Sequence, residues 1–315
     1  SSCSAERDRR NSVLEVDDPR VRREPYLSAP FIHKNNEPTG HANLLRANGQ
    51  AKTDRKYTLW FAATDIPANR AHIVKTHGRL QQRLQRFLQF HDQQTAGIPG
   101  LNVLYEGMQA RVTEKLVKHK HLVILKHSSC RVLRWELHPA DRPRQDGAER
   151  LLDYLPLWIF LHLEDATWII DKRLGPGVWP LYPVERTWTL NEALGTKIRR
   201  KGFTLVPDYA STAFMIQGAT LPAAIADCGD VAESGGLSEF RTLYVMLSKV
   251  KSADGLLLLR AFCPNVFQMG ALPGPHCLLK MLRHRFQTEA VFREVDSELV
   301  TSSVRKLVSE ILRRG

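Results

Sequence analysis

The chain has 315 residues, of which 43% are hydrophobic and 25% are charged, a composition that excludes a disordered protein and allows a buried core. The net charge of +12 favours a polyanionic partner such as nucleic acid. The five cysteines form no Cys-x-x-Cys pair, so we expect neither a disulfide framework nor a metal site. This cysteine usage indicates an intracellular protein without separating nucleus, organelle and cytoplasm. No apolar run approaches the roughly 18 residues of a membrane span, so no membrane partner is expected.

The N-terminal residues 1–50 mix charged residues with Pro, Asn and Gly, which predicts a flexible N-terminal arm. Tyr57–Ala63 is a compact apolar run of strand length. Thr64–Pro67 supplies capping oxygens and an early proline, and apolar residues recur at helical spacing up to about Phe90. The pattern therefore predicts a strand followed by a helix that begins at 64–67.

Residues 97–186 contain four short segments rich in β-branched and aromatic residues, separated by turn-forming clusters, which predicts a small antiparallel β-subdomain. The segments are Leu122–Lys126, Arg131–Leu137, Leu157–Leu163 and Thr167–Asp171. Five tryptophans in or near this region could stack on nucleic-acid bases, although core positions are the more common use of tryptophan. They are Trp135, Trp158, Trp168, Trp179 and Trp188.

A basic run at residues 197–201 precedes an apolar stretch, and we expect its charges to lie on a solvated hairpin. Contact with a DNA backbone is the sharper alternative for Arg199 and Arg200. At the other end of the chain, residues 263–315 comprise a connector and an apolar pattern with three- and four-residue steps. This pattern predicts a C-terminal amphipathic helix that docks on the parent domain or binds a partner.

Two stretches, 206–221 and 244–256, organise the C-terminal third. Phe203–Val206 has the composition of a strand, and a turn and a short helix are expected after it, capped by Ser211 or Thr212 and ended by Gly218. A buried strand is predicted at 221–226, and an element beginning at 243–248 leads into the apolar residues 256–259. This order predicts a parallel α/β unit with polar groups at its loop ends, where ligands usually bind.

These two stretches resemble the C-terminal motor motifs of superfamily 1 DNA helicases of the Pif and RecD branch. The first motif is matched in register by Tyr209, Ala210, Thr212, Gln217, Gly218, Thr220 and Leu221. The second is matched by Tyr244, Val245, Leu247, Ser248, Val250, Ser252, Asp254, Gly255 and Leu256. Phe214 and Met215 stand where the family has His-Lys, and Lys249 stands where it has an arginine.

The resemblance implies an α/β fold, a RecA-like parallel sheet with helices on both faces that carries an inserted, SH3-like antiparallel β-subdomain. Residues 51–96 and 187–262 would form the second RecA-like domain of the helicase, and 97–186 the insertion. Gln217, Gly218 and Lys249 would then bind nucleotide, with Gln217 and Lys249 in catalytic positions. Thr212, Thr220, Lys251, Arg199 and Arg200 would contact DNA, although Thr212 and Thr220 are equally plausible as helix caps.

A working helicase also needs a phosphate-binding G-x-x-x-x-G-K-[ST] loop, which the 315 residues lack. We therefore expect the C-terminal motor half of a helicase, inactive alone, with ATP and Mg²⁺ bound only when a first RecA-like domain completes the enzyme. Lys249 lacks the planar fork of the arginine it replaces, which places ATP hydrolysis in further doubt. The expected partners are single-stranded or partly duplex DNA and that first domain. The alternative is a stand-alone nucleic-acid-binding or protein-interaction module without ATPase activity.

Overall fold

The computed structural model describes residues 18–68, 88–119, 122–141, 149–191, 196–229, 236–260 and 262. The chain divides into two units, one of residues 1–228 and 245–260 and one of residues 229–244 and 261–315. The described helices are α2 (Asn36–Thr53) and α4 (Gly236–Leu247), with short 3-10 turns η1 (Pro19–Arg22), η3 (Asp92–Thr95) and η4 (Ala253–Gly255). The predicted C-terminal helix and most of the helix expected after residue 67 lie outside the described residues.

A four-stranded parallel sheet runs in the order β15 (Ala210–Thr212), β1 (Phe31–His33), β16 (Ala224–Asp227) and β17 (Leu256–Arg260). All four residues of β16 are buried, as expected for a strand of a parallel sheet that is covered on both faces. The expectation of a mixed α/β fold with a parallel sheet is therefore confirmed, and the sheet includes the strands expected near 221–226 and 256–259.

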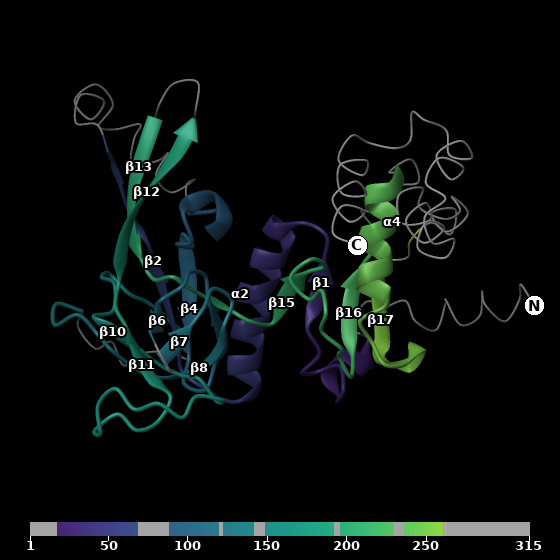
Figure 1. The fold of residues 1–315 in the computed structure, drawn as a ribbon, viewed down its shortest axis with the longest axis horizontal. Helices are drawn as coiled ribbons and strands as arrows, with labels where there is room; N and C mark the ends of the chain where they lie inside the picture. The colour runs from purple at the N-terminus through teal and green to yellow at the C-terminus, as the bar shows by residue number, and fades with distance from the viewer. Residues whose placement is uncertain are drawn as a thin grey trace, which may run out of the picture. The chain divides into compact units, whose positions relative to one another are not determined.

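The N-terminal region differs from the expected flexible arm, because its described part is built into this sheet. β1 pairs with both β15 and β16, and Ile32 at its centre is fully buried. α2 follows at once and lies against β15 (Figure 1). Asn43 of α2 is buried and accepts hydrogen bonds from the Tyr209 and Ala210 amides at 2.7 and 2.6 Å. The arm prediction failed because β1 has only three residues and α2 has few large apolar side chains, so neither gives a clear periodic signal.

A five-stranded antiparallel sheet, the largest of the described residues, accounts for most of the predicted β-subdomain. Its order is β11 (Val178–Leu181), β10 (Trp158–His162), β8 (Ser129–Glu136), β5 (Gln109–Val112) and β14 (Leu205–Pro207). Inward side chains such as Val132, Ile159 and Leu161 are fully buried and belong to the main core. The strand expected at Thr167–Asp171 is absent from this described segment, and the outermost strand is β11 instead.

Two expectations around this sheet are wrong. β14, which we expected beside the helicase-like parallel strands, pairs antiparallel with β5, so its apolar residues complete the β-rich core. Residues 210–212 form β15 instead of opening a helix, so neither Ser211 nor Thr212 is a helix cap. Parallel pairing with β1 overrides the capping preference of these hydroxyl residues.

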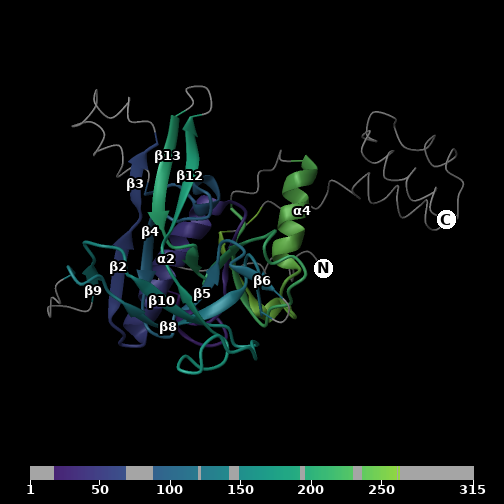
Figure 2. The same cartoon turned by 60° about the vertical axis from the view of Figure 1, so that its left-hand side comes forward.

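Three smaller sheets complete the described fold. One has the order β4 (Leu101–Leu104), β2 (Thr58–Ala62) and β9 (Glu149–Leu151), which confirms the strand predicted near 57–63. β6 (Val117–His119) pairs with β7 (Leu122–Ile124). The third contains β12 (Val184–Asn191), β13 (Thr196–Gly202) and β3 (Thr64–Pro67), side by side in Figure 2. Residues 64–67 are thus a strand and not the start of a helix, because their backbone pairs with β13.

Candidate functional site

The two motif stretches meet at Leu221. Its amide donates to the Lys249 carbonyl at 2.7 Å, and its carbonyl accepts from the Lys251 amide at 3.2 Å. Leu221 and Val250 thereby form a parallel bridge just before β16 and β17, the neighbouring strands into which the two stretches lead. Gln217 lies four residues before Leu221, within a chain reach of about 14 Å. Segments about thirty residues apart in sequence are thus joined at the amino ends of β16 and β17.

The first stretch reaches this point through a compact turn. Amides of Met215, Gln217 and Ala219 donate to carbonyls three residues earlier, at 3.0–3.2 Å. Gly218 has φ +89°, a left-handed conformation that most side chains disfavour, and no atom would contact an added Cβ. The glycine therefore serves backbone conformation, and it leaves the exposed Gln217 and Thr220 on either side of it.

The second stretch brings two cations to the same end of the sheet. Lys249 is half-buried and Lys251 is exposed. Together with the Gln217 amide and the Thr220 hydroxyl, they provide positive charge and hydrogen-bond donors suited to phosphate oxygens. This group of residues contains no carboxylate, thiol or imidazole. The group can bind an anion, but it contains no ligand that Mg²⁺ prefers and neither a carboxylate nor an imidazole base.

A second polar group lies at the carboxyl edge of the parallel sheet. Thr212, His33 and Asp227 end β15, β1 and β16, and Arg260 ends β17. The Arg260 guanidinium binds both Asp227 oxygens at 2.7 and 2.9 Å, and His33 Nε2 lies 3.9 Å from Asp227 Oδ2. Thr212, His33 and Asp227 are each more than nine-tenths buried.

This edge contains the topological switch point of the sheet. The chain leaves β1 toward β15 on one side of the sheet, and it leaves β16 toward β17 on the other side. The connections therefore diverge between β1 and β16, which is the switch point. His33 and Asp227 flank this position, where ligands bind in many open α/β sheets. Because Arg260 pairs with Asp227, this carboxylate helps to hold the strand ends together instead of offering a negative charge to a ligand. Sequence reasoning missed His33; the available signal was a short apolar run, Ala29–Ile32, that ends in a polar cluster.

The basic hairpin is confirmed, but its two arginines lie on opposite faces. Arg199 is exposed, and its Nε lies 3.2 Å from Glu185 Oε1. Arg200 is completely buried, binds both Asp65 oxygens at 2.7 and 2.6 Å and lies over the Trp188 ring at 5.4 Å. A solvated position for Arg200 is therefore wrong. Period-two alternation along β13 separates the pair, and adjacent arginines in a sequence give no sign of it.

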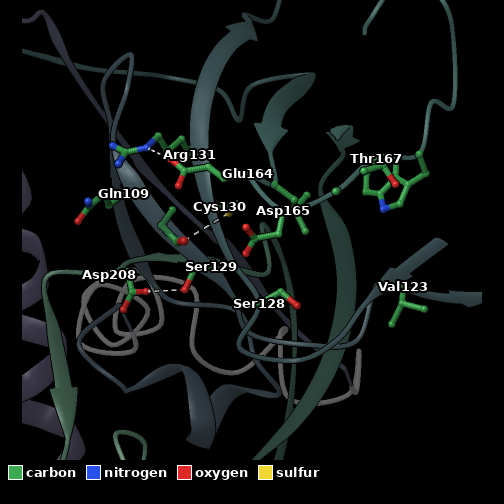
Figure 3. Close-up of a pocket in the computed structure, with 14 residues that line it drawn as sticks. Gln109, Val123, Ser128, Ser129, Cys130, Arg131, Glu164, Asp165, Thr167 and Asp208 are labelled. Atoms are coloured by element: carbon green, nitrogen blue, oxygen red, sulfur yellow. Dashed lines mark hydrogen bonds and ion pairs between the residues drawn. The ribbon is translucent and has the colours of Figure 1, made fainter. Parts of the chain in front are cut away.

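A polar pocket of about 680 Å³ lies on the antiparallel sheet and contains none of the predicted site residues. Figure 3 shows Asp165 near its centre, with Glu164 paired to Arg131 and Asp208 hydrogen-bonded to Ser129. Burial raises the pKa of the Cys130 thiol at its wall to about 12, with the Asp208 charge adding to this effect. That cysteine remains protonated at neutral pH, so the pocket gains no nucleophile from it.

The described part of the chain contains neither a cluster of metal ligands nor a membrane-spanning helix. No three His, Cys, Asp or Glu side chains of this part of the chain gather to hold a metal ion. None of its helices is long and apolar enough to cross a membrane.

Comparison with solved structures finds similarity to Pif1 helicases. With Pif1 helicase from Candida albicans the identity is 17% and the TM-score 0.47, covering 86% of this chain and 53% of that one. With Bacteroides Pif1 bound to ssDNA the values are 11% and 0.48, covering 88% and 48%. With Pif1 helicase from Bacteroides in complex with ADP-AlF3 and ssDNA they are 13% and 0.42, covering 88% and 52%. The chain thus spans about half the length of these structures. No family model and no curated protein sequence matches it.

Proposed function

We propose that the chain is the C-terminal motor half of a Pif/RecD-type DNA helicase, which couples ATP hydrolysis to movement along DNA when a first RecA-like domain completes it. The supporting observation is the junction at Leu221, where the Gln217–Leu221 and Lys249–Lys251 segments join by two backbone hydrogen bonds. The two motif segments could not act on one ligand if the fold held them far apart. Their junction beside a parallel sheet is what one wall of a nucleotide cleft requires.

On the nucleotide side, Lys249 is proposed to approach the terminal phosphate and Gln217 to lie beside it, with Gly218 shaping the turn. Bound ATP with Mg²⁺ would supply the phosphoryl group, held between this part and the first domain. Lys249 is a point charge without the bidentate fork of an arginine, which suits binding better than transition-state stabilisation. The chain by itself is therefore proposed to hydrolyse no ATP. Turnover that Lys249→Ala abolishes would contradict this.

On the DNA side, the proposed contact is a cationic strip formed by Lys197, Arg199 and Lys201. All three are exposed, and they alternate with the buried Ile198 and Arg200 along β13, so they share one face of the hairpin. Strand geometry places alternate residues about 6.8 Å apart. Regularly spaced cations of this kind can follow a phosphate backbone. Thr212, Thr220 and Lys251 are proposed as further contacts, whereas the buried Arg200 is proposed to support the strip from behind.

The test is binding to single-stranded DNA at rising salt. Replacing Lys197, Arg199 and Lys201 by Gln removes three charges, and at about 0.7 per phosphate the slope of log affinity against log salt should fall by about 2. The matched control replaces the exposed loop residues Lys56, Lys115 and Lys172 by Gln, which makes the same charge change away from the strip. If the salt slope fell equally in both variants, the effect would come from the net charge of the chain and not from the position of the strip. Salt-independent binding in the unaltered chain would overturn the proposal of DNA contact.

The second candidate function is a stand-alone binding module derived from a helicase. Phe214, which replaces the first residue of the family's His-Lys pair, has 60% of its surface exposed on the turn, and Lys249 replaces the arginine. An exposed aromatic is typical of an interaction surface. The two candidates are separated by the genomic sequence, because a phosphate-loop motif upstream in the same reading frame would restore the helicase.

A further inference from the structure

The outward face of β10 carries aromatic side chains where polar ones are usual. Along β10, Ile159 and Leu161 are fully buried, whereas Trp158, Phe160 and His162 point the other way. Antiparallel sheets with one solvated face normally alternate apolar with polar residues. Three successive aromatic rings on the outward positions of one strand therefore call for a functional explanation.

Cross-strand neighbours extend these rings into a platform. The Trp158 and Tyr182 rings lie 5.8 Å apart and are exposed by 38% and 53%. In the next row, Phe160 pairs with Arg134 on β8 and with Pro180 on β11. The Arg134 guanidinium lies 4.1 Å from the centre of the Phe160 ring. We call Trp158, Phe160, Tyr182 and Arg134 the aromatic platform. The only acid that pairs within its two rows is Glu136, opposite Trp158.

The platform leads along the chain into the cationic strip. Tyr182 follows β11 directly, and Glu185, three residues on, pairs with Lys201 in the hairpin. Three residues of extended chain span about 10 Å, so Glu185 lies within about 10 Å of the Tyr182 backbone. Lys201, the nearest cation of the strip, lies opposite Glu185. A ligand of the platform that extends in this direction would reach Glu185 and then the cations of the strip.

We propose that the aromatic platform binds the bases of single-stranded nucleic acid while the cationic strip holds the backbone. The Trp158 and Tyr182 rings meet edge to face at 71°, so each presents its own ring surface for stacking, and Arg134 over Phe160 adds a planar cation. The proposal rests on nucleic acid as the partner in the proposed function and adds a base-contacting site to it. Charge decides between this ligand and a proline-rich peptide, the other usual occupant of aromatic surfaces, because such a peptide would gain nothing from the adjoining lysines and arginine.

The test compares two probes of equal length, an oligothymidylate and an abasic oligonucleotide that keeps the phosphates but lacks bases. The unaltered chain should bind the oligothymidylate more tightly. Trp158→Ala and Tyr182→Ala should each weaken that binding about 5- to 100-fold and leave the abasic probe unaffected. Trp158→Phe, which keeps a ring, should restore most of the affinity. Tyr57→Ala is the control, since Tyr57 is 40% exposed and lies outside the platform.

The two probes test the aromatic platform and the cationic strip separately. Equal affinity for both probes, or unchanged binding in folded Trp158→Ala and Tyr182→Ala, would overturn the platform but leave backbone contact by the strip intact. Oligoproline binding that is lost in Trp158→Ala, with DNA binding unchanged, would assign the platform to a protein partner instead. No binding of either oligonucleotide would overturn both proposals.

Discussion

Asp65→Asn is expected to destabilise the fold strongly, because it removes the carboxylate that pairs with the buried guanidinium of Arg200. Both side chains are almost fully buried, with exposures of 0% for Arg200 and 2% for Asp65, and two hydrogen bonds of 2.6 and 2.7 Å join them. Breaking such a pair from one side costs about 3–5 kcal/mol. At about 2–4 °C per kcal/mol for a protein of this size, the thermal midpoint should fall by about 6–20 °C.

The double variant Asp65→Leu with Arg200→Leu should be much less affected, because two apolar side chains leave no buried charge. Arg200 also donates to the Ile98 carbonyl at 3.2 Å, so a residual cost of about 1 kcal/mol is expected. Glu185→Gln is the matched control on the same hairpin: its pair with Arg199 is 48% exposed on both sides, and its loss should change stability by less than about 1 kcal/mol. Urea and thermal unfolding followed by circular dichroism measure all three. If Asp65→Asn were no worse than Glu185→Gln, the assignment of Arg200 as a buried structural residue would be refuted.

Two further predictions concern the core. Asn43→Ala should remove the acceptor of the Tyr209 and Ala210 amides and lower the free energy of unfolding in urea by about 2–5 kcal/mol. Asn48→Ala on the same helix is the control and should cost less than about 1 kcal/mol. Similar losses in the two variants would show that Asn43 does not anchor β15. Burial raises the pKa of the Cys130 and Cys228 thiols to about 12. With the other three cysteines replaced by serine, disulfide-exchange reagents should therefore label these two slowly at pH 8 and rapidly in denaturant, and fast labelling of the native chain would contradict their burial.

Sequence patterns located the strands that consist of several consecutive apolar residues. The apolar runs at 57–63, 221–226 and 256–259 became strands, because burial on a sheet needs only a few consecutive apolar residues. The short elements escaped prediction, and so did α2, whose sequence has few large apolar residues. β1 has three residues, and β3 begins with the Thr64-Asp65 pair that is typical of a helix start, so tertiary pairing decided both.

Residue type was a weaker guide to the candidate site than strand register. Arg199 and Arg200 were equivalent as members of a basic run, and only the pairing of β13 with β12 and β3 assigns one to solvent and the other to Asp65. His33 reaches the switch point because β1 inserts between β15 and β16, whose partner residues lie 179 and 194 residues further along the chain. Contacts at such sequence separation leave no local periodic signal.

The position of β1 also constrains how the molecule can be assembled. β15 and β16 have β1 between them, so neither can pair with β1 until segments separated by about 180 to 194 residues of chain meet. Such non-local pairing closes large loops and is intrinsically slow. Proteolytic removal of the first 35 residues should therefore split the parallel sheet into an isolated β15 and a β16–β17 pair, although β1 contributes only three residues.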